Sequence, residues 1–147
     1  MNIAISGDHD SNSLKVLMIQ LLQDQGYTVR DFDCQDTSSA DYVGDATAVA
    51  EAVSRGAFTR GIVISKTGIE MSISANKVRG IRCALCTTTM QAEMTRRHND
   101  TNILALGAKV TGDALSKEIV SIWLTTEFEG GRHKRRVDKI SEYESRQ

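Results

Sequence analysis

Residues 65–70 carry the side chains best suited to chemistry, because hydroxyls, a lysine and a carboxylate fall within one short turn. The apolar run Gly61–Ile64 predicts a buried strand before the turn, and Ile69–Lys77 has the pattern of a helix after it. In an α/β protein such a strand–turn–helix junction lies at the carboxyl edge of the sheet, where ligands bind. Backbone N–H groups at a helix N-terminus favour an anionic oxygen. The sequence therefore predicts an anion-binding turn at residues 65–70.

Polar residues also follow other predicted strands. Gly7-Asp8-His9-Asp10 comes after the first strand and Asp41-Tyr42 after the second, so a parallel sheet would bring them to the same edge. His98-Asn99-Asp100 precedes the last strand, so periodicity alone does not place it in a site. The basic run Arg132–Arg136 adds cations from outside the sheet. Taken singly, a histidine is more often a structural or surface residue, and a basic run is more often a solvated helix start.

Apolar runs alternate with helical patterns along the chain. The expected strands are Asn2–Ser6, Tyr27–Phe32, Arg60–Ser65, Ile81–Thr87 and Ile103–Leu106. The expected helices are Ser13–Gln25, Ala46–Arg55, Ile69–Lys77, Met90–Arg97, Asp113–Leu124 and Arg132–Glu144. This alternation predicts an α/β fold, a three-layer α/β/α (Rossmann-like) single domain over residues 1–147 with a five-stranded parallel sheet and a C-terminal helix.

Composition argues against several functional classes. A net charge of −1 gives no general attraction to nucleic acid. The sequence contains no run of about 18 apolar residues, so no membrane span is predicted. The N-terminus has no basic and apolar leader, and an odd number of cysteines suggests a reducing compartment, so a cytoplasmic location is expected. The turn after the first strand lacks the further glycines of the dinucleotide fingerprint, which argues against NAD or FAD.

Cys83 and Cys86 have a C-x-x-C spacing but lie in a predicted strand. Residues three apart in a strand point to opposite faces, so core packing is favoured over a redox or metal role.

Several motifs, in order, resemble those of the ribose-5-phosphate isomerase type B and galactose-6-phosphate isomerase family. The resemblance covers nearly the whole chain and rests on Asp8-His9, Asp41-Tyr42, Thr67-Gly68-Ile69, Ser74–Lys77, Gly80-Ile81-Arg82, Arg97–Asn102 and Glu129–His133 with Arg136. It implies aldose–ketose isomerisation of a phosphorylated sugar, ribose 5-phosphate or a related tetrose to hexose phosphate, through an enediolate. The family's reaction uses no metal and no organic cofactor.

The resemblance also implies roles for the matching residues. His98 would assist ring opening together with Thr67. Backbone N–H groups of residues 66–70 would stabilise the enediolate oxygen. The implied substrate contacts are Asp8, His9, Tyr42, Lys66, Gly68, Asn76, Asn99, Lys109, Arg132 and Arg136, of which Lys109 and the two arginines would hold the phosphate. In this family the C-terminal arginines reach a neighbouring subunit's site, which implies a homodimer or tetramer with shared sites.

The proton-abstracting position departs from the family's pattern. Type B enzymes commonly carry cysteine where Ser65 stands, and an unaided serine hydroxyl is too weak a base. Some members use a glutamate in this turn instead, and by direct count it would fall at Met71, one position after Glu70.

Three hypotheses about this departure stay open. In the first, Glu70 is the base after a local shift of the turn, a role that carboxylate chemistry permits if burial raises its pKa toward neutrality. Alternatively, Lys66 and Glu70 contact an altered substrate. In the third, the chain is a non-catalytic or half-site sugar-phosphate-binding subunit of a heteromeric isomerase. Lys66 and Glu70 could also be no more than an exposed ion pair at the helix start.

Overall fold

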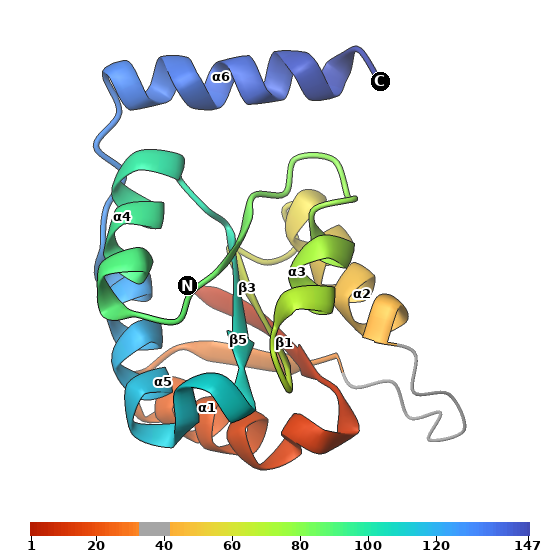
Figure 1. The fold of residues 1–147 in the computed structure, drawn as a ribbon, viewed down its shortest axis with the longest axis vertical. Helices are drawn as coiled ribbons and strands as arrows, with labels where there is room; N and C mark the ends of the chain where they lie inside the picture. The colour runs from red at the N-terminus through yellow and green to blue at the C-terminus, as the bar shows by residue number, and fades with distance from the viewer. Residues whose placement is uncertain (33–41) are drawn as a thin grey trace.

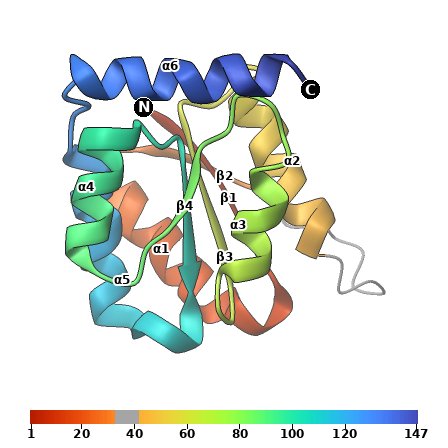
Figure 2. The same cartoon turned by 45° about the horizontal axis from the view of Figure 1, so that its top comes forward.

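A parallel sheet forms the centre of the protein, and helices cover both of its faces (Figure 1, Figure 2). The structure is a computed structural model that describes residues 1–32 and 42–147. The strands are β1 (Asn2–Gly7), β2 (Thr28–Asp31), β3 (Arg60–Ser65), β4 (Cys83–Leu85) and β5 (Ile103–Gly107), arranged in the order β2-β1-β3-β5-β4. The helices are η1 (His9–Ser11), α1 (Asn12–Asp24), α2 (Tyr42–Ser54), α3 (Ile69–Ala75), α4 (Thr89–Asn99), α5 (Ala108–Thr125) and α6 (Arg132–Ser145). The expected three-layer α/β/α fold is confirmed.

The two faces of the sheet bury side chains of different size. Large residues such as Ile5 and Leu104 pack in one cluster with α1, α4 and α5, whereas small ones such as Ala4 and Ala105 pack in a second cluster with α2 and α3. Helix α2 therefore lies close to the sheet, and a Cβ added to Gly61 would meet a methyl carbon of Val49 at 2.6 Å. Because both faces are covered, the strands read as continuous apolar runs rather than alternating ones.

Cys83 and Cys86 lie on opposite faces of the sheet, as the sequence predicted. Cys86 belongs to the cluster with α1, α4 and α5, and Cys83 packs against the other cluster. Burial raises the pKa of both thiols, that of Cys86 to about 12, which leaves them protonated near neutrality. Cys34 lies outside the described residues.

Element boundaries differ from the sequence prediction at glycines and at the sheet edge. Helix α5 begins at Ala108, directly after β5, and is interrupted at Gly112, where φ is 68° and ψ is −179°. The apolar periodicity becomes continuous only after this interruption, so the sequence predicted a start at Asp113. Strand β4 is shorter than expected because it lies at the edge of the sheet and pairs with β5 alone.

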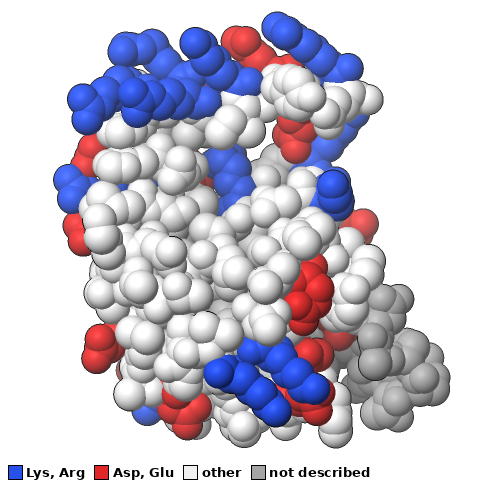
Figure 3. Space-filling view, viewed as in Figure 1, with Lys and Arg blue, Asp and Glu red and all other residues white. Residues whose placement is uncertain are grey.

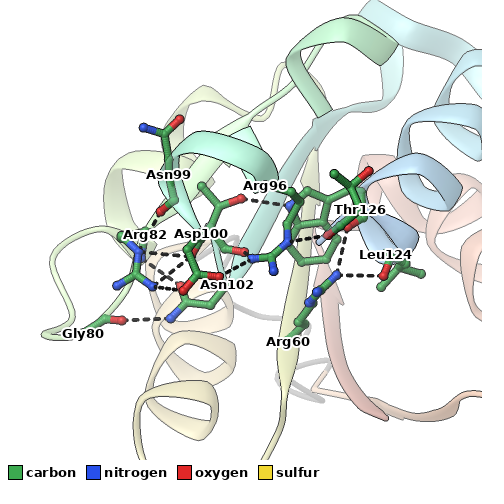
Figure 4. A network of polar contacts seen from close by, with 11 residues as sticks. Arg60, Gly80, Arg82, Arg96, Asn99, Asp100, Asn102, Leu124 and Thr126 are labelled. Atoms are coloured by element: carbon green, nitrogen blue, oxygen red, sulfur yellow. Dashed lines mark hydrogen bonds and ion pairs between the residues drawn. The ribbon is translucent and has the colours of Figure 1, made fainter. Parts of the chain in front are cut away.

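The connection from α4 to β5 is held by two arginines (Figure 4). Asp100 has a φ of 47°, a conformation that few residues other than glycine adopt. Arg96, which is buried, donates to Asp100 Oδ1 at 2.9 Å and to the Thr101 carbonyl at 2.6 Å. Arg82 donates to the Asp100 carbonyl at 2.8 Å. These bonds fix the end of α4, which carries His98 and Asn99.

Helix α6 lies across the amino ends of the strands, on the opposite side from the turns that follow β1 and β3 (Figure 1, Figure 2). Glu144 near its C-terminus accepts a hydrogen bond from the Gly80 N–H at 3.0 Å. A cleft of about 370 Å³ lies between α6 and this edge, and its lining includes Arg82, Asn99 and Ile140. Among residues 1–32 and 42–147, no helix has both the length and the apolar character needed to cross a membrane.

Candidate active site

The turn after β3 is pressed against the end of β5. Gly68 has a φ of 76°, and a Cβ there would lie 2.8 Å from the Leu106 carbonyl carbon. A Cβ on Gly107 would lie 2.6 Å from the Thr67 carbonyl oxygen, and the Lys109 N–H donates to the Lys66 carbonyl at 3.0 Å. Both glycines are therefore needed for the turn to reach this position. It lies at the carboxyl edge of the sheet, as predicted.

Side chains of the turn bond to its own backbone. Ser65 is fully buried, and its Oγ accepts the Gly68 N–H at 2.8 Å. The Thr67 hydroxyl accepts the Ile69 N–H at 3.3 Å and donates to Glu70 Oε2 at 3.0 Å. The N–H groups of Gly68 and Ile69 are thus occupied. Those of Lys66 and Thr67 have no hydrogen-bond acceptor among residues 1–32 and 42–147, so they are candidates for a substrate oxygen.

The Glu70 carboxyl group is stabilised as a carboxylate. Partial burial acts to raise its pKa, but hydrogen bonds from Ser65, from its own N–H and from Thr67 outweigh burial, and the pKa is lowered. The hypothesis that burial brings this pKa toward neutrality is therefore wrong. Glu70 is ionised at neutral pH, and it is half-buried at the start of α3.

Lys66 pairs with the turn after β1. Its Nζ lies 3.0 Å from Asp10 Oδ2, with both side chains about half exposed. The expected alternative of a Lys66–Glu70 ion pair is wrong, since Glu70 is bonded to Thr67. Lys66 lowers the pKa of Asp10, with smaller contributions from His9 and Lys109, so these charges share one edge. Asp8 caps η1 by accepting the Ser11 N–H at 2.9 Å.

A second group of predicted site residues lies at the amino edge of the sheet. His98 and Asn99 end α4, and the Asn99 carbonyl accepts a hydrogen bond from Arg82 at 3.0 Å. Arg132 and Arg136 are exposed on successive turns of α6. Basic side chains crowd this helix at the top of Figure 3.

A chain of contacts links the end of α4 to the start of α6. Arg97 donates from Nε to Glu129 Oε1 at 2.6 Å, and the Glu129 N–H donates to the Arg97 carbonyl at 3.1 Å. Glu129 Oε2 lies 3.3 Å from His133 Nε2. The His133 ring stacks on His98, with centroids 4.2 Å apart and planes 9° from parallel. The proposed ring-opening histidine and the proposed phosphate arginines are therefore parts of one linked unit.

His133 is the buried member of this unit. Burial lowers the pKa of its imidazole, and the positive charges of His98 and Arg132 lower it further against the opposing effect of Glu129. His98, Glu129 and His133 are also the one group among the described residues whose side chains could together hold a metal ion, with ligand atoms all within 4.8 Å of one another.

Known proteins match the chain over nearly its whole length. Residues 3–140 match the family described as Ribose/Galactose Isomerase. The chain belongs to this family. YwlF of Bacillus subtilis strain 168 is 52% identical over 99% of each chain. D-erythrulose-4-phosphate isomerase of Pectobacterium atrosepticum is 42% identical over 98% of this chain and 95% of that protein. The structure of ribose-5-phosphate isomerase B from Clostridium thermocellum has a TM-score of 0.95 and 49% identity over 99% of each chain. As a ribose/galactose isomerase family member, the protein is an enzyme of the aldose–ketose isomerase class.

A single copy of this ribose/galactose isomerase family member does not bring all of its predicted site residues together. Asp8, His9, the 65–70 turn and Lys109 lie at the carboxyl edge, whereas His98, Asn99, Arg132 and Arg136 lie at the amino edge. The six-residue strand β3 alone separates the edges by roughly 20 Å. No side chain of either group bridges this length.

Asn76 and Tyr42 are two further residues that were predicted to contact the substrate. The Asn76 amide donates to the Ser72 and Cys83 carbonyls, both at 2.9 Å, and its oxygen accepts the Cys83 N–H at 2.8 Å, so it ties α3 to β4. Tyr42 is exposed at the first residue of α2. Its neighbour Asp41 lies outside the described residues.

Sequence reasoning assigned no role to Asp10, Arg97, Glu129 or His133. The i,i+4 spacing of Glu129 and His133 across a helix start was a usable signal. The Asp10–Lys66 pair joins turns after different strands, so it depends on the tertiary structure and no local pattern indicates it.

Proposed function

We propose that the protein isomerises a phosphorylated sugar between its aldose and ketose forms, with ribose 5-phosphate as the first candidate substrate and tetrose to hexose phosphates as the range. Family membership and the solved ribose-5-phosphate isomerase B from Clostridium thermocellum support a pentose phosphate. The D-erythrulose-4-phosphate isomerase from Pectobacterium atrosepticum supports a wider substrate range among relatives.

The predicted site residues of one chain lie at opposite edges of the sheet, and this observation supports the proposal that each site is shared by two copies of the chain. A partner's α4 end and α6 would supply His98, Asn99, Arg132 and Arg136 to the carboxyl edge of the first copy. Exposed apolar side chains on α3 (Ile69 and Ile73) and on α6 (Ile140 and Tyr143), each more than half exposed, are surfaces that such a partner could cover.

In the proposed reaction His98 of one copy and Thr67 of the other open the sugar ring. Glu70 then removes the proton from C2 of the aldose, electrons move to the C1 oxygen, and the N–H groups of Lys66 and Thr67 stabilise the enediolate. Transfer of the C2 hydroxyl proton to the C1 oxygen, with return of the abstracted proton from Glu70 to C1, gives the ketose. Glu70 fits this task better than Ser65, because Ser65 is fully buried and its Oγ is already bonded to Gly68.

One observation favours the alternative of a sugar-phosphate-binding subunit without turnover. The Glu70 carboxylate accepts hydrogen bonds at the start of α3, where an anionic oxygen of the substrate would otherwise bind. Incubation of the purified protein with ribose 5-phosphate in deuterated water separates the two functions. Label at C2 and appearance of ribulose 5-phosphate are expected for the isomerase, whereas tight binding without label would establish the alternative.

Phosphate affinity should depend on Arg136. Its guanidinium is exposed one helical turn from Arg132, so the two can grip one phosphate. Replacement by alanine removes a charge-assisted contact of about 1.5–3 kcal/mol, so the Kd for the sugar phosphate should rise roughly ten- to a hundred-fold. Calorimetry measures this change. Arg135→Ala, on the same helix, is the matched control, and equal losses for both variants would contradict a specific role for Arg136.

A further inference from the structure

His133 has an unsatisfied buried nitrogen. The residue is 5% exposed, and its Nε2 has no hydrogen-bond partner among the described residues. A buried polar atom without a partner is costly and rare, so it calls for a physical explanation. The nitrogen faces Glu129 Oε2 at 3.3 Å without forming a hydrogen bond to it.

The geometry around this nitrogen is that of a partly formed zinc site. Bonds of about 2.0–2.1 Å from a tetrahedral zinc ion place two neighbouring ligand atoms about 3.3 Å apart. The separation of Glu129 Oε2 and His133 Nε2 is 3.3 Å. One ligand atom from each of these two residues and one from His98 lie within 4.8 Å of one another, so His98 completes a group of three protein ligands.

His98 must turn to reach the ion, and the structure leaves it able to do so. Its ring is stacked on His133, one of its nitrogens lies within 4.8 Å of the other ligand atoms, and the side chain is only half-buried at the end of α4. Glu129 is held in place from its other oxygen, because Arg97 donates to Oε1 at 2.6 Å and leaves Oε2 available. Such outer contacts orient metal ligands.

The donor atoms of the cluster select the kind of ion. Two of the three ligand groups are imidazoles, which offer nitrogen rather than oxygen. Magnesium and calcium require several oxygen ligands, whereas zinc and its neighbours bind imidazole well. We propose that His98, Glu129 and His133 bind one divalent transition ion of the zinc type, with an open fourth position, and that the bound ion holds His98 away from the sugar. The second half rests on the proposed function.

Cobalt(II) tests the site without any substrate. We expect untagged protein to bind one Co²⁺ per chain with the intense visible absorption of tetrahedral cobalt, to lose that absorption when Zn²⁺ is added, and to lose it with a chelator. The chain has three histidines, so His9→Asn is the matched control and should keep the spectrum. Cys34→Ser should also keep it, because no thiol takes part.

Loss of an outer contact to a metal ligand typically lowers metal affinity about 10- to 100-fold. Glu129→Gln and His98→Asn each remove a ligand itself, so each should reduce cobalt affinity at least about tenfold. His133→Asn should do the same, and circular dichroism checks that it folds. If His133→Asn does not fold, the exposed position of Glu129 and the half-buried position of His98 allow those two variants to decide. No cobalt spectrum, or a spectrum lost in His9→Asn or Cys34→Ser, would overturn the site.

Zinc inhibition then tests the consequence. Isomerase activity should fall as free Zn²⁺ occupies the site, and the residual activity of Glu129→Gln should be insensitive to the same concentrations. Full activity with the site occupied would overturn the inhibitory role while leaving the binding site intact. If the protein shows no isomerase activity, the proposed function fails, but the cobalt spectrum still supports or overturns the site.

Discussion

Replacing Glu70 with glutamine is expected to lower kcat for the isomerisation by about 10²- to 10⁴-fold, the usual contribution of a positioned general base. Glutamine keeps the shape of the side chain and can still accept the Thr67 hydroxyl, which donates to Glu70 Oε2 at 3.0 Å. Substrate affinity should therefore change little, and the loss should appear in kcat rather than in KM. Steady-state kinetics with ribose 5-phosphate and the other sugar phosphates measures both constants.

The pH dependence provides a second measure of Glu70. Hydrogen bonds from Ser65, its own N–H and Thr67 outweigh burial and lower its pKa. A base works only when deprotonated, so kcat/KM should fall on the acid side only below the ordinary carboxyl pKa of about 4.3. Thr67→Val removes one of the bonds that favour the carboxylate, so the acid limb should move to higher pH in this variant. An acid limb that does not move would contradict Glu70 as the titrating base.

Ser65→Ala is the matched control in the same turn. The change removes the acceptor of the buried Gly68 N–H, and an unpaired buried donor costs about 1–3 kcal/mol of unfolding free energy. The melting temperature should fall, whereas kcat should drop less than tenfold. If Ser65→Ala loses as much kcat as Glu70→Gln, serine takes part in the proton transfer and our assignment is wrong.

The central fold could be predicted from the sequence because its strongest signals are local. Each buried strand is a continuous apolar run. Neighbouring residues such as Ile5 and Ala4 face opposite sides of the sheet, so the large side chain packs in one core and the small one in the other. The boundaries were less predictable, since Gly112 interrupts α5 by a backbone conformation that the surrounding pattern does not reveal. The Asp100 turn depends on Arg82 and Arg96, which come from different elements.

The candidate site was predictable in its residue types but not in its arrangement. The resemblance brought His98 and Thr67 into one site, and only the topology shows that they lie at opposite edges of the sheet in one chain. The ionisation of Glu70 depends on the conformation of the turn, because hydrogen bonds from Ser65, its own N–H and Thr67 lower its pKa. The partner of Lys66 depends on tertiary structure, because Asp10 comes from a turn far away in the sequence. Local pattern therefore identified the groups, and their partners required the structure.

Mixing two inactive variants should restore activity if each site is shared between two copies of the chain. Glu70→Gln damages the carboxyl edge, and His98→Asn damages the amino edge. A hybrid dimer of the two has one site with both changes and one site with neither. With equal amounts and free exchange, half of the dimers are hybrids, so activity should rise from near zero to about a quarter of the unaltered protein.

The matched control mixes two variants of the same edge. In a hybrid of Glu70→Gln and Thr67→Val each site contains one altered carboxyl edge, because Thr67 and Glu70 lie three residues apart in one turn. Activity should then stay at the level of the separate variants. Native mass spectrometry confirms that hybrids form in both mixtures. Hybrids without recovered activity in the first mixture would place the whole site within one chain, and recovery in the control mixture would mean that the two residues act in different sites.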